Sequence, residues 1–335
     1  MYTLKTFFPS ETAPCFTQIR EILYPEAIRA LQKSGDSIDS DIAFTGLCIE
    51  KNGMPAGRLI LYKPELQAEG KKVLAAGNYE CSNDPEAARL LLEGAMKIAE
   101  QEGCDALIGP MNGTTWSNYR FAASAVNDTF FSEMIHLPYY AAQWEANGFQ
   151  TLARYISTID RSNYFDPEGI QEEEARFREA GIHFRNIRLE NFEEELALIF
   201  PLCEKAFAGN FLFSPVSRET FSRKYLAIKP YIDPAMVFFA ETPQKEIAGF
   251  AFNFPDHLCK TEKRMIVKTL VRNPRPEFAG LGNVLANLSQ RFAAANNYDA
   301  VIHALMHADN YSAALSEKYH GELFRRYNLY IKSSS

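Results

Sequence analysis

The stretch that decides the fold reads Arg264-Met-Ile-Val-Lys-Thr-Leu-Val-Arg-Asn-Pro-Arg-Pro-Glu-Phe-Ala-Gly-Leu-Gly-Asn-Val-Leu285. Its apolar first part predicts a strand over 264–272, and apolar residues at helical spacing predict a helix that begins at Leu281. Gly280 and Gly282 let the backbone approach a ligand, and a helix start leaves N–H groups unpaired at the positive end of the helix dipole. Such a turn binds phosphate or pyrophosphate; the alternative is a glycine turn that only packs the helix tightly.

The same order of elements occurs twice in the chain. Asn52–Tyr62 and Gln244–Phe254 both place turn residues before Ala-Gly and an apolar strand, with an offset of 192 residues between Ala56 and Ala248. The strand at Val73 matches the one at Met265 with the same offset of 192, and that at Asp105 matches Asp299 with an offset of 194. A nearly constant offset predicts an internal duplication. We therefore expect two domains, 1–165 and 166–335, joined near 166–169.

Each half has three consecutive strands and then a strand–helix–strand unit. Three strands without helices favour an antiparallel section, and the strand–helix–strand unit favours one parallel pair. The sequence thus predicts an α/β fold with a mixed sheet (α+β) in each half.

The first half provides an internal control for the glycine turn. It has Glu80-Cys-Ser-Asn-Asp-Pro-Glu86 where the second half has glycines. Asp84 and Glu86 would repel a phosphate, and Pro85 at the first helical position removes an N–H. We therefore expect one anion site per chain, in the second half, where Lys268, Arg272 and Arg275 add positive charge.

Composition excludes several classes of function. Lys+Arg 35 against Asp+Glu 42 gives a net charge of −7, which speaks against a nucleic-acid footprint. No apolar run reaches the ~20 residues of a membrane span, and the first residues do not resemble a signal peptide. The six cysteines are scattered without a C-x-x-C pair, which indicates buried thiols, not disulfides, and a cytoplasmic location.

The second half resembles the GNAT family of acyl-CoA N-acyltransferases. The matching pieces are a strand, a loop ending in Gly-x-Gly, a helix, a second strand and Asn-x-x-Ala on the next helix: Ile266–Arg272, Glu277–Gly282, the helix to Asn296, Val301–Ala304 and Asn310–Ala313. The first half resembles a second GNAT domain that keeps Trp144-Glu-Ala-Asn-Gly-Phe149 but lacks the pyrophosphate loop. The whole chain is similar to bacterial tandem-GNAT proteins, on three further strings: Gly109–Asn112, Pro138–Tyr140 and Phe252–Asp256.

This resemblance implies an acetyl-CoA or other acyl-CoA co-substrate and direct transfer of the acyl group to an amine. The strands at 264–272 and 300–305 are expected to splay into a wedge. The implied cofactor-binding residues are Leu270, Val271, Arg272, Phe278, Ala279, Gly280, Leu281, Gly282, Asn283 and Asn310. The family usually has Arg or Gln where Glu277 stands, and a Tyr acid where Glu317 stands. The predicted general acid is therefore Tyr319, two residues further on.

The acceptor is expected to be a small-molecule or peptide amine. Candidate substrate-binding residues are Asn112, Trp116, Tyr139, Tyr140 and Asp256. No metal is expected, because His303 and His307 lie ~13 Å apart on one strand. Two alternatives stay open: a non-catalytic module that binds acyl-CoA or a small ligand, and an aminoacyl-tRNA-dependent transferase of the peptidoglycan-bridge type. The oligomeric state is not defined by the sequence.

Overall fold

The computed structural model describes residues 1–11, 13–31, 38–63, 66–123, 129–162, 164–165 and 167–334. It divides into two compact units that are discontinuous in sequence. Unit 1 contains the described residues of Met1–Asn127, Ser132–Arg154 and Arg326–Ser335, and unit 2 those of Asp128–Phe131 and Tyr155–Arg325. Asp166 of the expected joint lies outside the described residues, and the division into 1–165 and 166–335 stays a prediction. Within the described ranges, no helix has the length and apolar character needed to cross a membrane.

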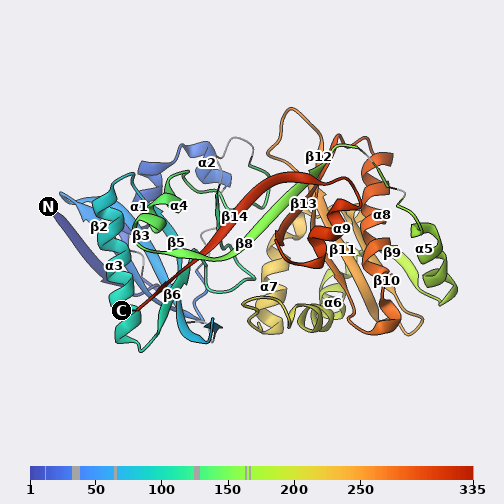
Figure 1. Cartoon of the computed structure of the whole chain (residues 1–335), viewed down its shortest axis with the longest axis horizontal. Helices are drawn as coiled ribbons and strands as arrows, with labels where there is room; N and C mark the ends of the chain where they lie inside the picture. Colours follow the sequence, from blue (N-terminus) through green and yellow to red (C-terminus); the bar gives the residue numbers. More distant parts are fainter. Residues whose placement is uncertain are drawn as a thin grey trace. The chain divides into compact units, whose positions relative to one another are not determined.

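Unit 1 is built on a sheet with the strand order β1-β2-β3-β5-β6 (Figure 1). The first four are antiparallel neighbours and β5 pairs with β6 in parallel. Its elements are β1 (Tyr2–Phe7), α1 (Pro14–Leu23), α2 (Glu26–Leu31), β2 (Ala43–Lys51), β3 (Met54–Tyr62), β4 (Gln67–Ala68), β5 (Lys71–Cys81), α3 (Pro85–Gln101), β6 (Ala106–Gly109), β7 (Phe121–Ala122) and α4 (Tyr140–Ala146).

Unit 2 repeats this plan with the order β9-β10-β11-β12-β13, again with only the last pair parallel. Its elements are α5 (Ile170–Glu179), β9 (His183–Asn186), η2 (Leu189–Asn191), α6 (Phe192–Phe207), α7 (Arg218–Ile228), η3 (Lys229–Tyr231), η4 (Pro234–Met236), β10 (Val237–Glu241), β11 (Ile247–Pro255), β12 (Arg264–Arg272), η5 (Pro276–Phe278), α8 (Leu281–Ala295), β13 (Ala300–His307) and α9 (Tyr311–Glu317). The predicted mixed α/β order, an antiparallel section followed by a parallel strand–helix–strand unit, is confirmed in both units.

The last strand of each sheet comes from the other half of the chain. The part of β8 (Gln150–Asp160) from Tyr155 onward pairs antiparallel with β13 in unit 2. The end of β14 (Glu322–Ser333) pairs antiparallel with β6 in unit 1. The sequence pattern did not indicate this exchange, because an amphipathic strand carries no local signal of which sheet it joins.

The crossover helices bury the faces that their sequences predict. In unit 2, Leu281 and Leu285 of α8 pack on Ala248 and Ala251 of β11. Gly249 lies directly beneath this helix, because a Cβ there would come within 2.9 Å of Leu285 and 2.8 Å of a backbone oxygen. The missing side chain therefore lets α8 lie close to the sheet.

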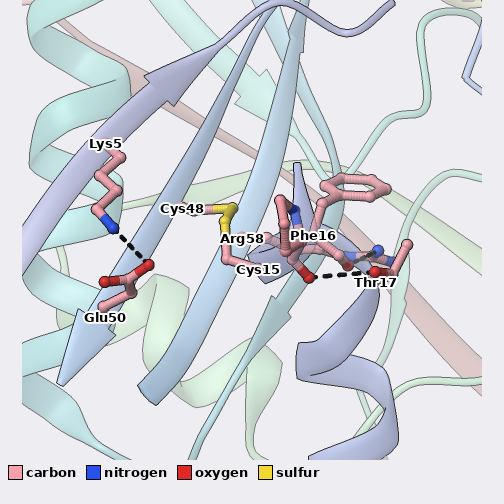
Figure 2. The surroundings of a disulfide bond; sticks show 8 residues. Lys5, Cys15, Phe16, Thr17, Cys48, Glu50 and Arg58 are labelled. Atoms are coloured by element: carbon pink, nitrogen blue, oxygen red, sulfur yellow. Dashed lines mark hydrogen bonds and ion pairs between the residues drawn. A yellow bond between two sulfur atoms is a disulfide. The ribbon is translucent and has the colours of Figure 1, made fainter. Parts of the chain in front are cut away.

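The prediction of free thiols is wrong for two cysteines. Cys15 of α1 and Cys48 of β2 form a disulfide, with their Cα atoms 6.4 Å apart (Figure 2). The remaining cysteines are free; they are Cys81, Cys104 and Cys203, which are buried, and Cys259, which is partly exposed. The pairing could not be predicted because residues 33 positions apart are brought together only by packing of the helix on the sheet.

Candidate functional site

The parallel pair of unit 2 splays apart, as predicted for the wedge. Its ladder runs from Arg264 opposite Ala300 to Val267 opposite His303 and ends there. Strand β12 nevertheless continues to Arg272, paired only with β11 on its other side. The last residues of β12 therefore form a strand edge next to a gap in the sheet.

The backbone groups on this edge can be assigned from the register. Asn273 donates its N–H to the carbonyl of Ala248 on β11. In an antiparallel ladder the peptide groups of alternate residues point to opposite sides of the strand, so the N–H and C=O of Val271 point toward β11, and those of Leu270 and Arg272 point away from it. Within the part of the chain that the structure describes, the peptide groups of Leu270 and Arg272 have no hydrogen-bond partner on the wedge side. Two of the predicted cofactor residues thus offer free backbone donors and acceptors.

The start of α8 offers a second set of free donors. Gly280 caps the helix with φ +90°, a left-handed conformation that favours glycine. The N–H groups of Gly280, Leu281 and Gly282 have no partner among the described residues. A Cβ on Gly282 would meet nothing within 4 Å, so this side of the turn is open. The turn therefore has free N–H donors of the kind that bind phosphate groups, with open space beside Gly282.

One carboxylate already lies at this turn. Glu173 of α5 accepts hydrogen bonds from Asn283 Nδ2, at 3.0 Å through Oε2, and its Oε1 would lie 2.9 Å from a Cβ on Gly280. Arg176, one turn further along α5, donates to the Ala279 carbonyl at 2.7 Å. Glu173 is the residue that sequence reasoning missed, because its distance of 110 positions from Asn283 leaves no local signal.

The remaining charged groups at the turn are exposed. Glu277, the departure from the family pattern, pairs with Arg275 at 3.2 Å, and both side chains are about half exposed. Arg272 is also exposed and donates to the Asn273 carbonyl. The predicted Phe278 is buried, whereas Ala279 is exposed. Of the three cations predicted to assist an anion, Arg272 and Arg275 are therefore exposed, whereas Lys268 is partly buried.

The equivalent turn of unit 1 is closed by an acidic side chain. Asp84 caps α3 and accepts from the N–H groups of Glu86 and Ala87. Hydrogen bonds from Lys51 above all, and from Tyr2, hold the pKa of Asp84 at about 2, so it stays ionised. An anion would have to displace a charged cap here, as the sequence comparison of the two halves predicts.

The splayed edge of β5 in unit 1 is also closed. Asn112 Oδ1 accepts the Asn78 N–H at 2.7 Å, and the Tyr140 hydroxyl accepts the Cys81 N–H at 3.1 Å. The Tyr139 hydroxyl donates to the Cys81 carbonyl at 3.0 Å. Three of the predicted substrate residues therefore satisfy the backbone of unit 1, and their contact with a substrate stays a prediction.

The other two predicted substrate residues lie in different units. Trp116 is partly exposed in unit 1, in the loop between β6 and β7. Asp256 is buried in unit 2, where Oδ1 accepts from Phe131 and Leu258 and Oδ2 lies 3.9 Å from Arg264. Asp256 thus fixes a loop, and a role in holding a cationic amine stays untested.

Tyr319, the predicted acid, lies under the start of α8. It is 1% exposed, and its hydroxyl donates to the Asn283 carbonyl at 3.2 Å. Burial raises the pKa of Tyr319, so its proton is retained well beyond neutral pH. Asn310 caps α9 without a side-chain hydrogen bond and is exposed, and its neighbour Tyr311 donates to Asn283 Oδ1 at 3.0 Å. The structure thus brings Tyr319 and the glycine turn together through Asn283.

A buried polar network lies beside Tyr319. His303 Nδ1 is 2.7 Å from Ser316 Oγ, which is 2.6 Å from Thr158 Oγ1, and Gln290 Nε2 joins His303 to Asp160. Burial lowers the pKa of His303 to about 4, so it is neutral at pH 7. We assign this network to the positioning of α8 and α9 on β13. Among the described residues, no group of three His, Cys, Asp or Glu side chains could hold a metal ion.

Comparison with known proteins gives structural likeness without sequence likeness. The sequence matches no family model and no curated protein. A tandem GNAT protein from the clavulanic acid biosynthesis pathway matches with a TM-score of 0.56 at 10% identity, covering 100% of this chain and 99% of that one. GNAT structures from Sphaerobacter thermophilus and Anabaena variabilis each match 99% of this chain, at 12% and 10% identity, with TM-scores of 0.51 and 0.57. They are covered over 95% and 73% of their own lengths. At such identities the likeness shows the fold alone.

Proposed function

The chain has the tandem GNAT fold, and on that premise we propose that it is an acyl-CoA-dependent N-acyltransferase with one co-substrate site, in unit 2. The observation that supports this most is the contrast between two copies of one plan. In unit 2 the splayed strand edge and the helix start have free backbone groups, whereas in unit 1 side chains of the same unit bind those groups.

In this proposal the N–H groups of Gly280–Gly282 hold the diphosphate of the co-substrate, and the helix dipole of α8 adds to their attraction. The free peptide groups of Leu270 and Arg272 orient the pantetheine arm and polarise the carbonyl of the thioester. Acyl-CoA supplies an activated thioester, which an acceptor amine attacks directly. We expect Glu173 to move away from Asn283 when the diphosphate binds, because the two anions repel each other at the turn.

Tyr319 is the proposed proton donor to the departing thiolate. Its raised pKa keeps the hydroxyl protonated but also makes it a weaker acid, and its hydrogen bond to the Asn283 carbonyl connects it with the turn proposed to hold the diphosphate. Because the hydroxyl is buried, the acid role requires that binding release it from Asn283. The acceptor is a small-molecule or peptide amine; Asn112, Trp116, Tyr139, Tyr140 and Asp256 stay its candidate contacts.

The test is calorimetric titration of the full chain with CoA and acetyl-CoA, followed by a thiol-release assay over a panel of amines. Gly282→Asp gives unit 2 the first-turn carboxylate that unit 1 has at Glu86. We expect it to fold normally, because the site is open and an acid there suits the helix dipole, and to weaken CoA binding at least about fivefold. Gly209→Asp is the matched control, since a Cβ there also meets nothing within 4 Å.

The same experiment separates the alternatives. Binding without thiol release on any amine would favour a non-catalytic acyl-CoA module, which the buried Tyr319 hydroxyl would suit. If CoA does not bind, both the transferase and the non-catalytic acyl-CoA module are excluded. No feature of the described residues favours the tRNA-dependent alternative. A cytoplasmic location stays a prediction, and the Cys15–Cys48 disulfide weighs against it, because disulfides persist mainly in oxidising compartments.

A further inference from the structure

Unit 2 contains an apolar cavity that the predicted site does not explain. It lies between helices α6 and α7 and strands β10 to β12. Among its walls are Leu196 and Ile199 of α6, Tyr225 of α7, Phe250 and Phe252 of β11, and Thr269 of β12. Protein interiors leave few voids larger than a water molecule, so this cavity is a candidate site for a small group.

The chemistry of the walls specifies an apolar occupant. The lining residues are aliphatic or aromatic except Thr269, and among them only Thr269 and Tyr225 carry a hydroxyl, whereas a buried water typically makes about three hydrogen bonds. The cavity is therefore expected to stay dry. A hydrocarbon group is the occupant that gains most from these walls, because it leaves water without losing hydrogen bonds.

The position of the cavity connects it with the proposed thioester site. Thr269 precedes Leu270, whose peptide groups face the wedge, and it is paired with Phe252 across the ladder. Phe250 and Phe252 face α6, whereas Ala251 faces α8, so the cavity lies on the face of the sheet opposite α8. A chain attached at the edge of β12 near Leu270 would reach the cavity by passing over Thr269.

The size of the cavity limits the length of the chain. About 20 Å³ is open to the centre of a water-sized sphere. One water needs roughly 10–15 Å³ on this measure, so the space holds about one or two methylene-sized groups. We propose that this cavity receives the end of a short acyl chain, about one or two carbons longer than acetyl, and so sets the acyl specificity of unit 2. The inference rests on the proposed function, since the chain enters as part of an acyl-CoA.

The test is calorimetry on the full chain with CoA and with acetyl-, propionyl-, butanoyl-, hexanoyl- and octanoyl-CoA. Affinity should rise about fourfold per added carbon up to butanoyl and then stop rising, because each buried methylene contributes a similar transfer free energy. Phe252→Leu enlarges the cavity and should move the optimum to a longer chain. Phe254→Leu, the same change two residues along β11 and outside the cavity lining, should leave the optimum where it is.

Ile199→Phe fills the cavity and should remove the chain-length preference while acetyl-CoA binds as before. Equal affinity for CoA and every acyl-CoA would overturn the inference and leave the proposed function standing, as would the same optimum in Phe252→Leu and Phe254→Leu. No binding of CoA itself would overturn the proposed function first. If Ile199→Phe does not fold, the comparison between the two phenylalanine variants decides alone.

Discussion

Glu173 provides the sharpest perturbation of the proposed site, because its carboxylate lies where the diphosphate should bind. Glu173→Gln removes one negative charge and keeps a hydrogen-bonding side chain beside Asn283. Two unit charges about 4 Å apart interact by about 1 kcal/mol in water-like surroundings, and exposed pairs give somewhat less. We therefore expect CoA to bind about fivefold more tightly, which corresponds to about 1 kcal/mol.

The same substitution should lower the free energy of unfolding while it raises the affinity for CoA, and a general loss of structure would not produce this combination. A carboxylate near a helix start contributes about 0.3–1 kcal/mol, so the free energy of unfolding should fall by that amount. The assay is calorimetric titration with CoA at low salt and at 0.15 M salt, where the gain should shrink as the charges are screened. Glu172→Gln, an exposed neighbour on α5, is the control. An affinity for CoA that is unchanged or weaker relative to this control would refute competition at the turn.

Three further predictions concern Tyr319, His303 and the cysteines. Tyr319→Phe should lower the free energy of unfolding by about 1 kcal/mol, because it removes the hydrogen bond to the Asn283 carbonyl. If Tyr319 is also the acid, the variant should show a lower kcat with unchanged affinity for CoA. An unchanged kcat would leave Tyr319 a structural role only. Because burial lowers the pKa of His303 from 6.5 to about 4, the unfolded chain takes up a proton first as pH falls, so stability should drop by roughly 3 kcal/mol between pH 6.5 and 4 in urea titrations. His303→Gln should flatten that slope, and an equal slope in both proteins would count against it. Cys259 should be the first cysteine to react with a thiol reagent, because it is partly exposed and its pKa is lowered. Partial burial raises that pKa, but the hydrogen bond with Thr261 contributes to a net lowering. The buried Cys81 and Cys203 should react only when the protein unfolds, because burial raises the pKa of both thiols. Fast labelling of Cys15 or Cys48 without reductant would contradict the disulfide.

Local patterns in the sequence predicted most of the fold. The strand at 264–272 and the helix from Leu281 lie where apolar periodicity places them, because both bury one face against the same layer. The splay of β12 from β13 was expected from the family resemblance and is present. The exchange of β8 and β14 between units was not, since it depends on tertiary pairing alone.

The candidate site was less accessible to sequence reasoning. The glycine turn can be identified in the sequence, because few residues other than glycine adopt the φ of Gly280. Glu173 cannot be identified in this way, because it reaches the turn only through packing of α5 on α8. The sequence predicts Tyr139 and Tyr140 as substrate-binding residues. In the structure their hydroxyls form hydrogen bonds with the backbone of β5. Sequence alone does not distinguish a side chain that binds a ligand from one that forms hydrogen bonds with the backbone groups that a ligand would otherwise bind.

The most direct test of the central claim is a crystal structure of the full chain soaked with CoA. We predict that the diphosphate will lie on the N–H groups of Gly280, Leu281 and Gly282, with the side chain of Glu173 moved away from Asn283. A nucleotide bound at the start of α3, or CoA bound in unit 2 with the Glu173–Asn283 bond intact and the turn unused, would contradict it.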